Sequence, residues 1–548
     1  MFTVKMCGKS YDLDAKTSIL SLIGDDEKKN YYVAKVNNRL RELNYELCFN
    51  CEVELLTLES VDSVKVYETS LRYLVAMAFF NVNPALKIRI SYNVSRALMV
   101  EVVSPKDFAV DFNLVKTVKA EMLRLVAADI PFERAAMSKD EAHEFYKKIG
   151  ADDKDAILQY RPEKVCHFYK CNGYLNYMYG YMVPSTGYLK QFNIFNYGSN
   201  IVVQYPRAEM GGKIPVFEDA PTFGRGLKAA HDWAKICNAE TVAKMNGHIA
   251  ADTQVDFINM CETRHNDMLY ELGSKIEENI DDIRLICIAG PSSSGKTTFS
   301  NRLRIELMSR GINPLRISLD MYYKEKKDCP LDEFGKPDFE NIDALDLEYF
   351  NEQMIDLIHG KEVALPVFDF KEGRLNSGKL TRIDEHTPII IEGIHALNDK
   401  LSFAIPNHQK FKIYIAPQLQ LNLDNDNPVS LTDLRLLRRI VRDRQFRATE
   451  AEHTIDMWAS VRRGEFRWIY PYQEDCDFVF NSALTYELCV IKKYAVPALS
   501  KIQPDSPYYI TANRLMKALK YFKDIDDEYV PCNSLLREFI GGSCFKDV

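Results

Sequence analysis

The chain has 548 residues, of which 46% are hydrophobic, 27% charged and 11% aromatic. This length predicts roughly three to five domains, each with its own core, and the composition excludes a disordered chain, a collagen-like fibre and a disulfide-stapled miniprotein. The 70 Lys and Arg against 78 Asp and Glu give a net charge of −8, which argues against a protein that coats nucleic acid and leaves only local basic patches as anion sites.

The termini and the apolar runs predict the cellular location. The first ten residues lack the apolar run of a secretory signal, and the stretches at 74–80 and 389–391 fall far short of the roughly 20 residues that cross a bilayer. We therefore expect a soluble, cytoplasmic protein.

The 13 cysteines are spread along the chain. Their odd number and apolar contexts, such as that of Cys287, predict reduced thiols packed as small hydrophobic side chains. Cys48 and Cys51 form a single C-x-x-C, but no second pair follows at zinc spacing, so the sequence disfavours a metal site there.

The predicted elements of the first half form three blocks. Residues 1–60 alternate β-like runs with one helical stretch and predict a small α+β module. Residues 61–215 mix helices with strands, dense in Tyr, Phe and Asn at 166–205, and predict a second α+β domain. Residues 216–280 have helical spacing with few β-branched residues and predict a helical connector.

Residues 281–500 have a different rhythm, in which strands and helices alternate. We expect its largely apolar strands at 285–289, 315–319, 389–392 and 411–415. Such strands are typical of a parallel sheet covered on both faces, so the predicted fold class is α/β, a doubly wound sheet preceded by two smaller α+β domains. Residues 501–548 add a helix and an apolar tail that we expect to dock on the body.

A phosphate-binding motif follows the first of these strands. Gly290 to Thr297 read G-P-S-S-S-G-K-T and fit G-x-x-x-x-G-K-[ST], between a β-branched strand and a helical stretch. Small residues let backbone N–H groups turn toward phosphate oxygens, and the helix presents its positive end to them. Lys296 can reach the terminal phosphates, and Thr297 can place its hydroxyl on Mg²⁺. The sequence thus predicts ATP binding through Gly290, Ser292, Ser293, Ser294, Gly295, Lys296, Thr297 and Thr298.

Two acids end apolar strands of the same block. Asp320 follows the strand at 315–319, and ligands of open α/β sheets bind outside the carboxyl ends of the strands. It could therefore take a proton from an attacking hydroxyl, with a helix cap or surface turn as the alternative. Glu392 could support magnesium, directly or through water, or it could simply face solvent. Tyr322 and Tyr323 could wall a flat ligand, although such aromatic residues are more often core.

One predicted helix face gathers arginines at i, i+3, i+4 and i+7, with two more close behind: Arg435, Arg438, Arg439, Arg442, Arg444 and Arg447. Such a run is usually a solvated face paired with acids, but only Asp443 lies within this one. Guanidinium groups suit phosphate oxygens, so we favour a mobile lid over the phosphates that stabilises the transferring charge.

Six blocks in order carry a resemblance to a known family: 290–298, 320–323, 339–346, 366–370, 391–394 and 435–447. Through them, residues 283–500 resemble the uridine kinase branch of the uridine kinase/phosphoribulokinase family. The resemblance implies a P-loop nucleoside kinase that transfers the γ-phosphate of ATP to the 5′-hydroxyl of a ribonucleoside, with uridine or cytidine as the expected acceptor.

The same resemblance implies roles for single residues. Asp320 matches the general base, and Thr297, Asp320 and Glu392 match the magnesium shell. Arg442 and Arg447 match lid arginines that act in catalysis with Lys296.

The acceptor pocket departs from the family pattern. Glu340 stands where the family usually has an Asp that holds the ribose hydroxyls, and Phe368 and Phe370 match residues that line the base pocket. Lys371-Glu372-Gly373-Arg374 replaces the short segment that bears a base-reading His in uridine-cytidine kinases. The identity of the base therefore stays open.

The front half resembles the amino-terminal region of threonyl-tRNA synthetase. Residues 1–60, with 33–40 and 53–56, resemble its ubiquitin-like TGS module. Residues 61–215, with Pro131-Phe-Glu-Arg134 and Pro184-Ser-Thr-Gly187, are similar to its second additional, or editing, domain.

The residues of the editing reaction are replaced in this chain. Thr69 and Tyr73 stand at the H-x-x-x-H pair, and Met178 and Met182 at the C-x-x-x-H pair. Thioether and phenol groups cannot take those acid, base and thiol roles. We infer that hydrolytic editing is absent and that this half binds, regulates or holds an oligomer together.

The prediction is a cytoplasmic, homo-oligomeric, Mg²⁺-dependent ATP:nucleoside kinase with small-molecule ligands and no membrane partner. One alternative is a P-loop kinase of another small alcohol or a sugar phosphate. The other is a tRNA-binding, translation-linked regulator with a nucleotide switch. The TGS-like half supports it, but the net acidity disfavours nucleic acid as a partner.

Overall fold

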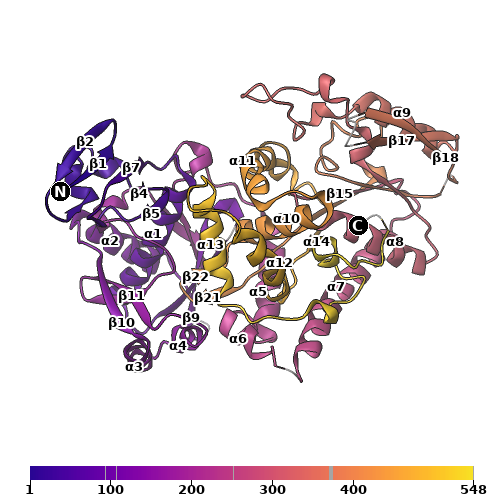
Figure 1. Cartoon of the computed structure of the whole chain (residues 1–548). Helices are drawn as coiled ribbons and strands as arrows, with labels where there is room; N and C mark the ends of the chain where they lie inside the picture. Colours follow the sequence, from indigo (N-terminus) through magenta and orange to yellow (C-terminus); the bar gives the residue numbers. More distant parts are fainter. Residues whose placement is uncertain (93, 107, 251, 370–373, 385, 547–548) are drawn as a thin grey trace.

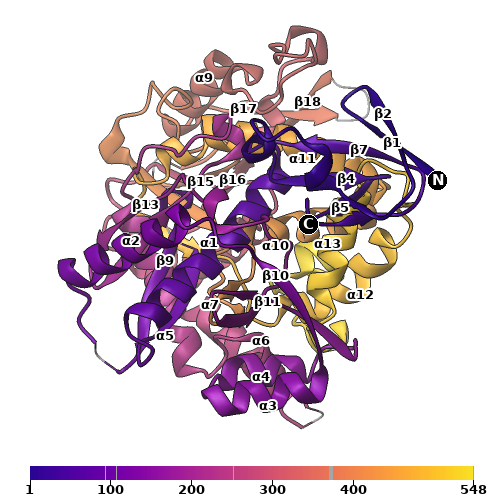
Figure 2. The same ribbon diagram turned by 90° about the vertical axis from the view of Figure 1, so that its left-hand side faces the viewer.

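The computed structural model describes residues 1–92, 94–106, 108–250, 252–369, 374–384 and 386–546. The amino-terminal half packs beside a carboxyl-terminal α/β block (Figures 1 and 2). Among the described residues, no helix is both long and apolar enough to span a membrane.

Residues 1–60 form a five-stranded sheet in the order β2-β1-β7-β4-β5, in which β1 and β7 pair in parallel and the other pairs are antiparallel. The helical stretch expected here was wrong: the described residues 1–60 hold only two 3₁₀ turns, Ile19–Leu22 and Lys28–Asn30. This Asp- and Lys-rich stretch lacks the apolar stripe that stabilises a longer helix. The strands are β1 Phe2–Met6, β2 Lys9–Leu13, β3 Thr17–Ser18, β4 Val33–Val36, β5 Arg39–Arg41, β6 Glu46–Leu47 and β7 Cys51–Leu56.

Helix α1 (Val61–Val82) is the centre of the amino-terminal half, because nearly all its residues from Ser63 to Phe79 are buried. Around it lie two antiparallel sheets, β13-β14-β9-β8 and β10-β11-β12. One apolar core runs from Val4 to Tyr205, so the two modules expected here pack as one body. The other elements are β8 Lys87–Tyr92, β9 Leu98–Ser104, α2 Phe112–Ala127, β10 Glu133–Ser138, α3 Lys139–Ile149, α4 Asp152–Leu158, β11 Val165–Cys171, β12 Tyr174–Tyr177, β13 Asn193–Tyr197 and β14 Asn200–Gln204.

The connector is helical, as the sequence predicts, with α5 (Pro221–Ile236), α6 (Val242–Gly247) and α7 (Gln254–Glu277). It is more than a linker, because α7 packs against α8 (Lys296–Ser309) and α5 against the edge strand β23 (Phe478–Asn481). Its buried side chains share one core with the α/β block.

The α/β block is built on a five-stranded parallel sheet in the order β16-β19-β15-β20-β23. Successive strand residues point to opposite faces: Ile286 and Ile288 enter the core shared with α7 and α8, whereas Leu285 and Cys287 enter the core beneath α9. The doubly wound sheet is therefore confirmed. Its remaining strands are β15 Leu285–Ala289, β16 Leu315–Ser318, β19 Ile389–Glu392 and β20 Lys410–Ala416.

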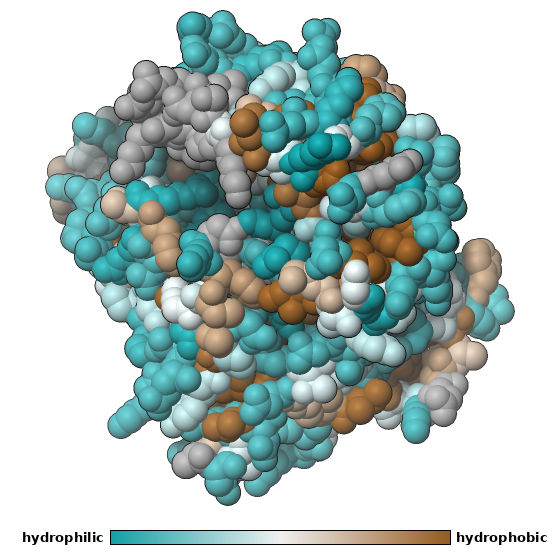
Figure 3. Space-filling model, turned by 90° about the vertical axis from the view of Figure 1, so that its right-hand side faces the viewer, coloured by the Kyte–Doolittle hydropathy of each residue, from teal (hydrophilic) through white to brown (hydrophobic). Residues whose placement is uncertain are grey.

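The helices and hairpins around this sheet complete the block. The hairpin β17–β18 and α9 lie at the end away from the amino-terminal half (Figure 1), and the surface seen from that side is largely hydrophilic with scattered apolar patches (Figure 3). The elements are α9 Leu347–Ile358, β17 Val363–Asp369, β18 Arg374–Thr381, β21 Asn422–Asp424, β22 Asn427–Pro428, α10 Leu431–Arg447, α11 Ala451–Trp468, α12 Glu487–Leu499, α13 Tyr509–Leu519 and α14 Arg537–Ile540.

The hairpin β21–β22 joins the two halves just before α10 begins. Asp426 accepts hydrogen bonds from Lys154 at 2.6 Å and from Asn176 at 2.8 Å, and its carbonyl accepts one from Arg72 at 2.6 Å. Since these hydrogen bonds join largely buried polar groups of the two halves, the contact fixes the amino-terminal half against the sheet.

Candidate active site

The phosphate loop lies between β15 and α8, as the motif predicts. Gly290 has no room for a side chain, because a Cβ there would lie 2.0 Å from the carbonyl oxygen of Ile415. Gly295 begins the helix with φ +93°, which favours glycine. Lys296 curls back over the loop and donates to the carbonyl of Gly290 at 3.0 Å. The loop thus has the compact shape that brings backbone N–H groups to one anion.

The serines of the loop differ in their surroundings. The hydroxyl of Ser292 accepts a hydrogen bond from Arg439 at 2.7 Å. Within the described part of the chain, the hydroxyls of Ser293, Ser294 and Thr298 are buried without a hydrogen-bond partner. These unpaired hydroxyl groups are free to bind a ligand or water.

Asp320 follows strand β16, and Glu392 is the last residue of the neighbouring parallel strand β19. The structure brings both acids to the same edge of the sheet as Lys296. Glu392 is buried, and this burial together with the charge of Asp320 raises its pKa to about 7, against the opposing effect of Lys296. The two carboxylates and the lysine thus lie within electrostatic reach of one another.

The side chain of Asp320 can be reached by solvent. Much of the space around it is nevertheless filled by protein, and this loss of surrounding water raises its pKa. Three cations oppose this rise and favour the carboxylate, namely Lys296, Arg447 and Arg442. The structure therefore gathers an accessible acid and the predicted lid cations around the phosphate loop.

Glu340 approaches the same group from the segment before α9. Burial raises its pKa to about 7, while Arg439 and Lys296 lower it. Glu340 fits beside α11 because residue 464 of that helix is glycine. A Cβ on residue 464 would lie 2.5 Å from the Cβ of Glu340. His395 neighbours Glu340 with its pKa lowered to about 4 by burial, and sequence reasoning missed it although it follows Glu392 by three residues.

The arginine face of α10 divides into two parts. Arg435 forms a buried ion pair with Glu465 of α11, and Arg438 pairs with Glu487 of α12 at 2.5 Å. The expectation of uncompensated charge was therefore wrong for these two residues, because their partners lie 30 and 49 positions away in sequence.

The same two arginines also hold the phosphate loop from behind. Arg435 donates to the carbonyl of Ser292 at 3.1 Å and Arg438 to that of Ser293 at 3.3 Å. This part of α10 is a fixed support of the loop. Arg442 and Arg447, further along the helix, both form ion pairs with Asp443, and their positive charges lower the pKa of Asp320.

The two tyrosines expected to contact a ligand lie in different surroundings. Tyr322 is fully buried, donates to Gln353 at 2.8 Å and packs edge-on against Phe350, so its place is in the core. Tyr323 is 9% exposed and lies within electrostatic reach of Asp320 and Glu340. Of the predicted base-pocket residues, Phe370 lies outside the described residues, and Phe368 is described only by its backbone in β17.

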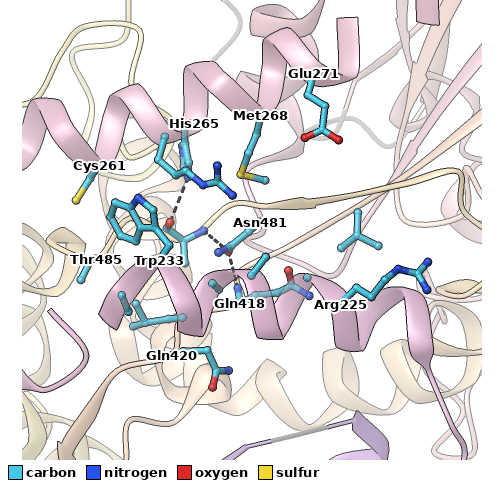
Figure 4. Close-up of a pocket in the computed structure, with 18 of the residues that line it drawn as sticks. Arg225, Trp233, Cys261, His265, Met268, Glu271, Gln418, Gln420, Asn481 and Thr485 are labelled. Atoms are coloured by element: carbon cyan, nitrogen blue, oxygen red, sulfur yellow. Dashed lines mark hydrogen bonds between the residues drawn. The ribbon is translucent and has the colours of Figure 1, made fainter. Parts of the chain in front are cut away.

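A separate cavity of about 280 Å³ lies over the edge strand β23, between α5 and α7 (Figure 4). His265, Ala483, Asn481 and Gln418 are linked there by hydrogen bonds of 2.7 to 3.2 Å. Its lining includes none of the residues from Gly290 to Thr298, so it is distinct from the phosphate loop.

Comparisons with known proteins concern mainly the α/β block. A model described as the phosphoribulokinase / uridine kinase family matches residues 285–488. A uridine kinase of Staphylococcus aureus (strain JH9) is 32% identical over 196 residues, which cover 36% of this chain and 86% of that protein. A uridine kinase of Ligilactobacillus salivarius (strain UCC118) is 29% identical over 196 residues, 36% of this chain and 83% of that protein. A solved structure described as a possible uridine kinase from Bacillus stearothermophilus covers 38% of this chain and 100% of its own, with 16% identity and a TM-score of 0.23.

The parallel sheet, its phosphate loop and these relatives define a P-loop phosphotransferase with an alcohol acceptor. Through residues 285–488, the chain belongs to the phosphoribulokinase/uridine kinase family. The family match leaves out residues 1–284 and 489–548.

Proposed function

We propose that this protein transfers the γ-phosphate of ATP, with Mg²⁺, to the 5′-hydroxyl of a ribonucleoside, with uridine or cytidine preferred. The observation that carries the proposal is the convergence of Asp320, Glu392 and Lys296 at the carboxyl edge of the sheet, next to the phosphate loop. An acid, a magnesium-supporting acid and a phosphate-binding lysine are the groups that phosphoryl transfer to an alcohol needs.

The donor set fits a magnesium ion. Thr297, Asp320 and Glu392 offer a hydroxyl and two carboxylates, which are hard oxygen ligands of the kind Mg²⁺ prefers. Within the described residues, no group of three or more His, Cys, Asp and Glu side chains could hold a metal ion by itself. A site of one or two carboxylates completed by the phosphates and water is compatible with this finding. When bound, the ion would neutralise charge on the β- and γ-phosphates.

The protein's own groups would divide the remaining work. The phosphate-loop amides and Lys296 hold the triphosphate, and Asp320 accepts the proton of the acceptor hydroxyl. Arg442 and Arg447 offset the negative charge that spreads over the transferring group. Glu340 would accept hydrogen bonds from the ribose hydroxyls, with Tyr323 beside it.

The test is ADP release with Mg²⁺-ATP against ribonucleosides, deoxyribonucleosides and sugar phosphates, in the wild type and in Asp320→Asn. We expect uridine or cytidine to stimulate turnover, and Asp320→Asn to lower it by about 10²-fold or more while ATP still binds. Asp328→Asn removes an exposed acid from the neighbouring loop and serves as the matched control.

The other outcomes separate the alternatives. Normal turnover by Asp320→Asn would remove this residue from the role of base. Stimulation by a sugar phosphate alone would favour the second kind of acceptor, which the residues after Phe370 already leave open. No stimulation by any acceptor, with ATP bound, would favour a nucleotide switch and call for a test of tRNA binding.

For the front half, we propose a TGS-like and editing-like module without hydrolytic activity, which regulates the kinase or holds an oligomer together. Support comes from the residues at the two editing pairs, which are all buried: Thr69, Tyr73, Met178 and Met182. The Tyr73 hydroxyl donates to the carbonyls of Tyr169 and Tyr174, so it is committed to the core.

A further inference from the structure

The end of the chain forms a packed element against the phosphate loop. We call residues 530–544 the tail; it contains α14 and lies outside the family match. Leu535, Leu536 and Phe539 are 0% exposed and belong to the core that also contains α8 and α10 residues. Helix α14 contacts both α8 and α10, and it lies near the carboxyl terminus in Figure 1. The tail is therefore part of the folded body.

One acid of the tail binds directly to the phosphate loop helix. The Glu538 carboxylate accepts a hydrogen bond from the backbone N–H of Thr298 at 2.9 Å. Thr298 is the third residue of α8, so its N–H has no partner within the helix. In phosphate loops, such amides at the helix start bind phosphate oxygens. The carboxylate of Glu538 thus occupies a position that suits a phosphate.

The tail also covers the last glycine of the loop. A Cβ on Gly295 would lie 2.3 Å from Cδ2 of Leu535, so the leucine packs directly against this backbone. The contact places an apolar side chain beside the loop that the triphosphate must enter. A nucleotide phosphate at the Thr298 amide would have to displace Glu538 and, with it, the neighbouring packing.

The charge of Glu538 acts on the cations of the site. Its negative charge favours the charged forms of Lys296 and Arg447, against the burial that lowers the pKa of each. The ring of Phe539 lies 4.9 Å from the guanidinium carbon of Arg438, which supports the loop from behind. The tail therefore interacts with the same cationic groups that the triphosphate would meet.

The tail is held in this position by its own hydrogen bonds. Ser534 donates to Glu262 of α7 at 2.5 Å, and Arg537 donates to the carbonyls of Asp527 at 2.7 Å and Val530 at 2.6 Å. Arg537 also donates to the carbonyl of Gly541 at 3.2 Å, so contacts fix the backbone on both sides of α14. Glu538 therefore contacts Thr298 from a helix, α14, whose position is fixed.

We propose that the tail is an autoinhibitory plug of the nucleotide site, in which the Glu538 carboxylate replaces a phosphate of ATP on the first turn of α8. The inference rests on the proposed kinase function, because it assigns the ligand that the plug excludes. ATP binds only to the fraction of molecules whose tail has left the loop, so the apparent Kd exceeds the intrinsic one by the inverse of that fraction.

The test measures ATP binding by calorimetry on the full chain, for the wild type, Glu538→Gln and Glu528→Gln. Glu538→Gln keeps the shape of the side chain but removes the charge, and we expect the Kd for ATP to fall about tenfold. Glu528→Gln removes an exposed acid that lies just before the tail and for which no contact with the loop is found among the described residues, so this variant should bind ATP like the wild type. Hydrogen exchange across 530–544 should increase when the wild type is saturated with ATP.

Each result has one meaning. An unchanged or higher Kd in Glu538→Gln, with wild-type binding intact, overturns the plug, and so does tail exchange that stays slow at saturating ATP. If neither protein binds ATP and both are folded by circular dichroism, the proposed kinase function fails, and the plug fails with it. A wild-type protein that binds ATP but phosphorylates no acceptor leaves the plug testable by the same binding experiment.

Discussion

The two halves of the molecule both enclose charged side chains, but they use them in different ways. Where the amino-terminal half meets α6 and the β21–β22 hairpin, a cavity of about 1310 Å³ lined by α1, α4 and the β8–β9 sheet contains ion pairs, such as that of Lys154 with Asp426. At the carboxyl edge of the parallel sheet, Asp320, Glu392 and Lys296 instead shift one another's pKa next to a loop with unpaired buried hydroxyls. Paired charges stabilise an interface, whereas converging groups are poised for a ligand that the protein alone does not supply.

The residues at the positions that resemble the editing pairs sharpen this contrast. Tyr73 and Met182 are almost completely buried, and the tyrosine hydroxyl is satisfied by two carbonyls. Side chains in that state contribute packing and, for the tyrosine, hydrogen bonds within the core, and they are closed to a substrate. The comparison therefore predicts that mutations in the parallel-sheet region change turnover and mutations in the front half change stability.

The largest expected effect is that of Lys296→Ala. Turnover should be abolished and ATP binding weakened, because we propose this side chain as the cation that reaches the terminal phosphates. ADP release and ATP calorimetry measure the two effects, with Lys326→Ala as an exposed lysine control from the same domain. Turnover that survives Lys296→Ala would break the comparison, because the phosphate loop would then not be the site of chemistry.

A smaller effect is expected for the end of α10. Arg442→Ala and Arg447→Ala should each lower turnover by about 10²-fold with little change in protein stability, because their charges act on Asp320 and we propose that they offset charge during transfer. Arg444→Ala, on the same last turns of the helix, should leave turnover near wild type. An equal loss of turnover in all three variants would mean that α10 supports the site by its position and that no single arginine contributes to transfer.

Sequence reasoning succeeded where neighbouring residues encode the geometry. The strand before Gly290 and the acids that follow apolar strands could be placed because parallel strands end at one edge of a sheet. The contacts of Arg435 with Glu465, and of Thr298 with Glu538, join residues 30 and 240 positions apart, so no local pattern contains them. Tyr322 follows Asp320 by two residues, yet it turns into the core, because a 3₁₀ turn, Leu319–Tyr322, separates their directions.

The smallest expected effect tests the front half. Tyr73→Phe removes the hydroxyl that donates to Tyr169 and Tyr174, and should lower the free energy of unfolding by about 1–2 kcal/mol. Urea unfolding measures this loss. The control is Tyr270→Phe, because Tyr270 is 66% exposed and its substitution should leave the free energy of unfolding almost unchanged. Nucleoside phosphorylation by Tyr73→Phe at 25 °C should equal that of the wild type, because the hydroxyl is committed to the core of the other half.

The complementary measurement on the same proteins is release of the amino acid from aminoacyl-tRNA. We expect both proteins to release the amino acid at the uncatalysed rate. The buried Met178 and Met182 stand where the editing reaction needs a thiol and an imidazole. Hydrolysis above that rate by the wild type, lost in Tyr73→Phe, would show that the front half carries out chemistry of its own. The distinction between a catalytic parallel-sheet region and a front half that contributes only stability would then no longer apply to this chain.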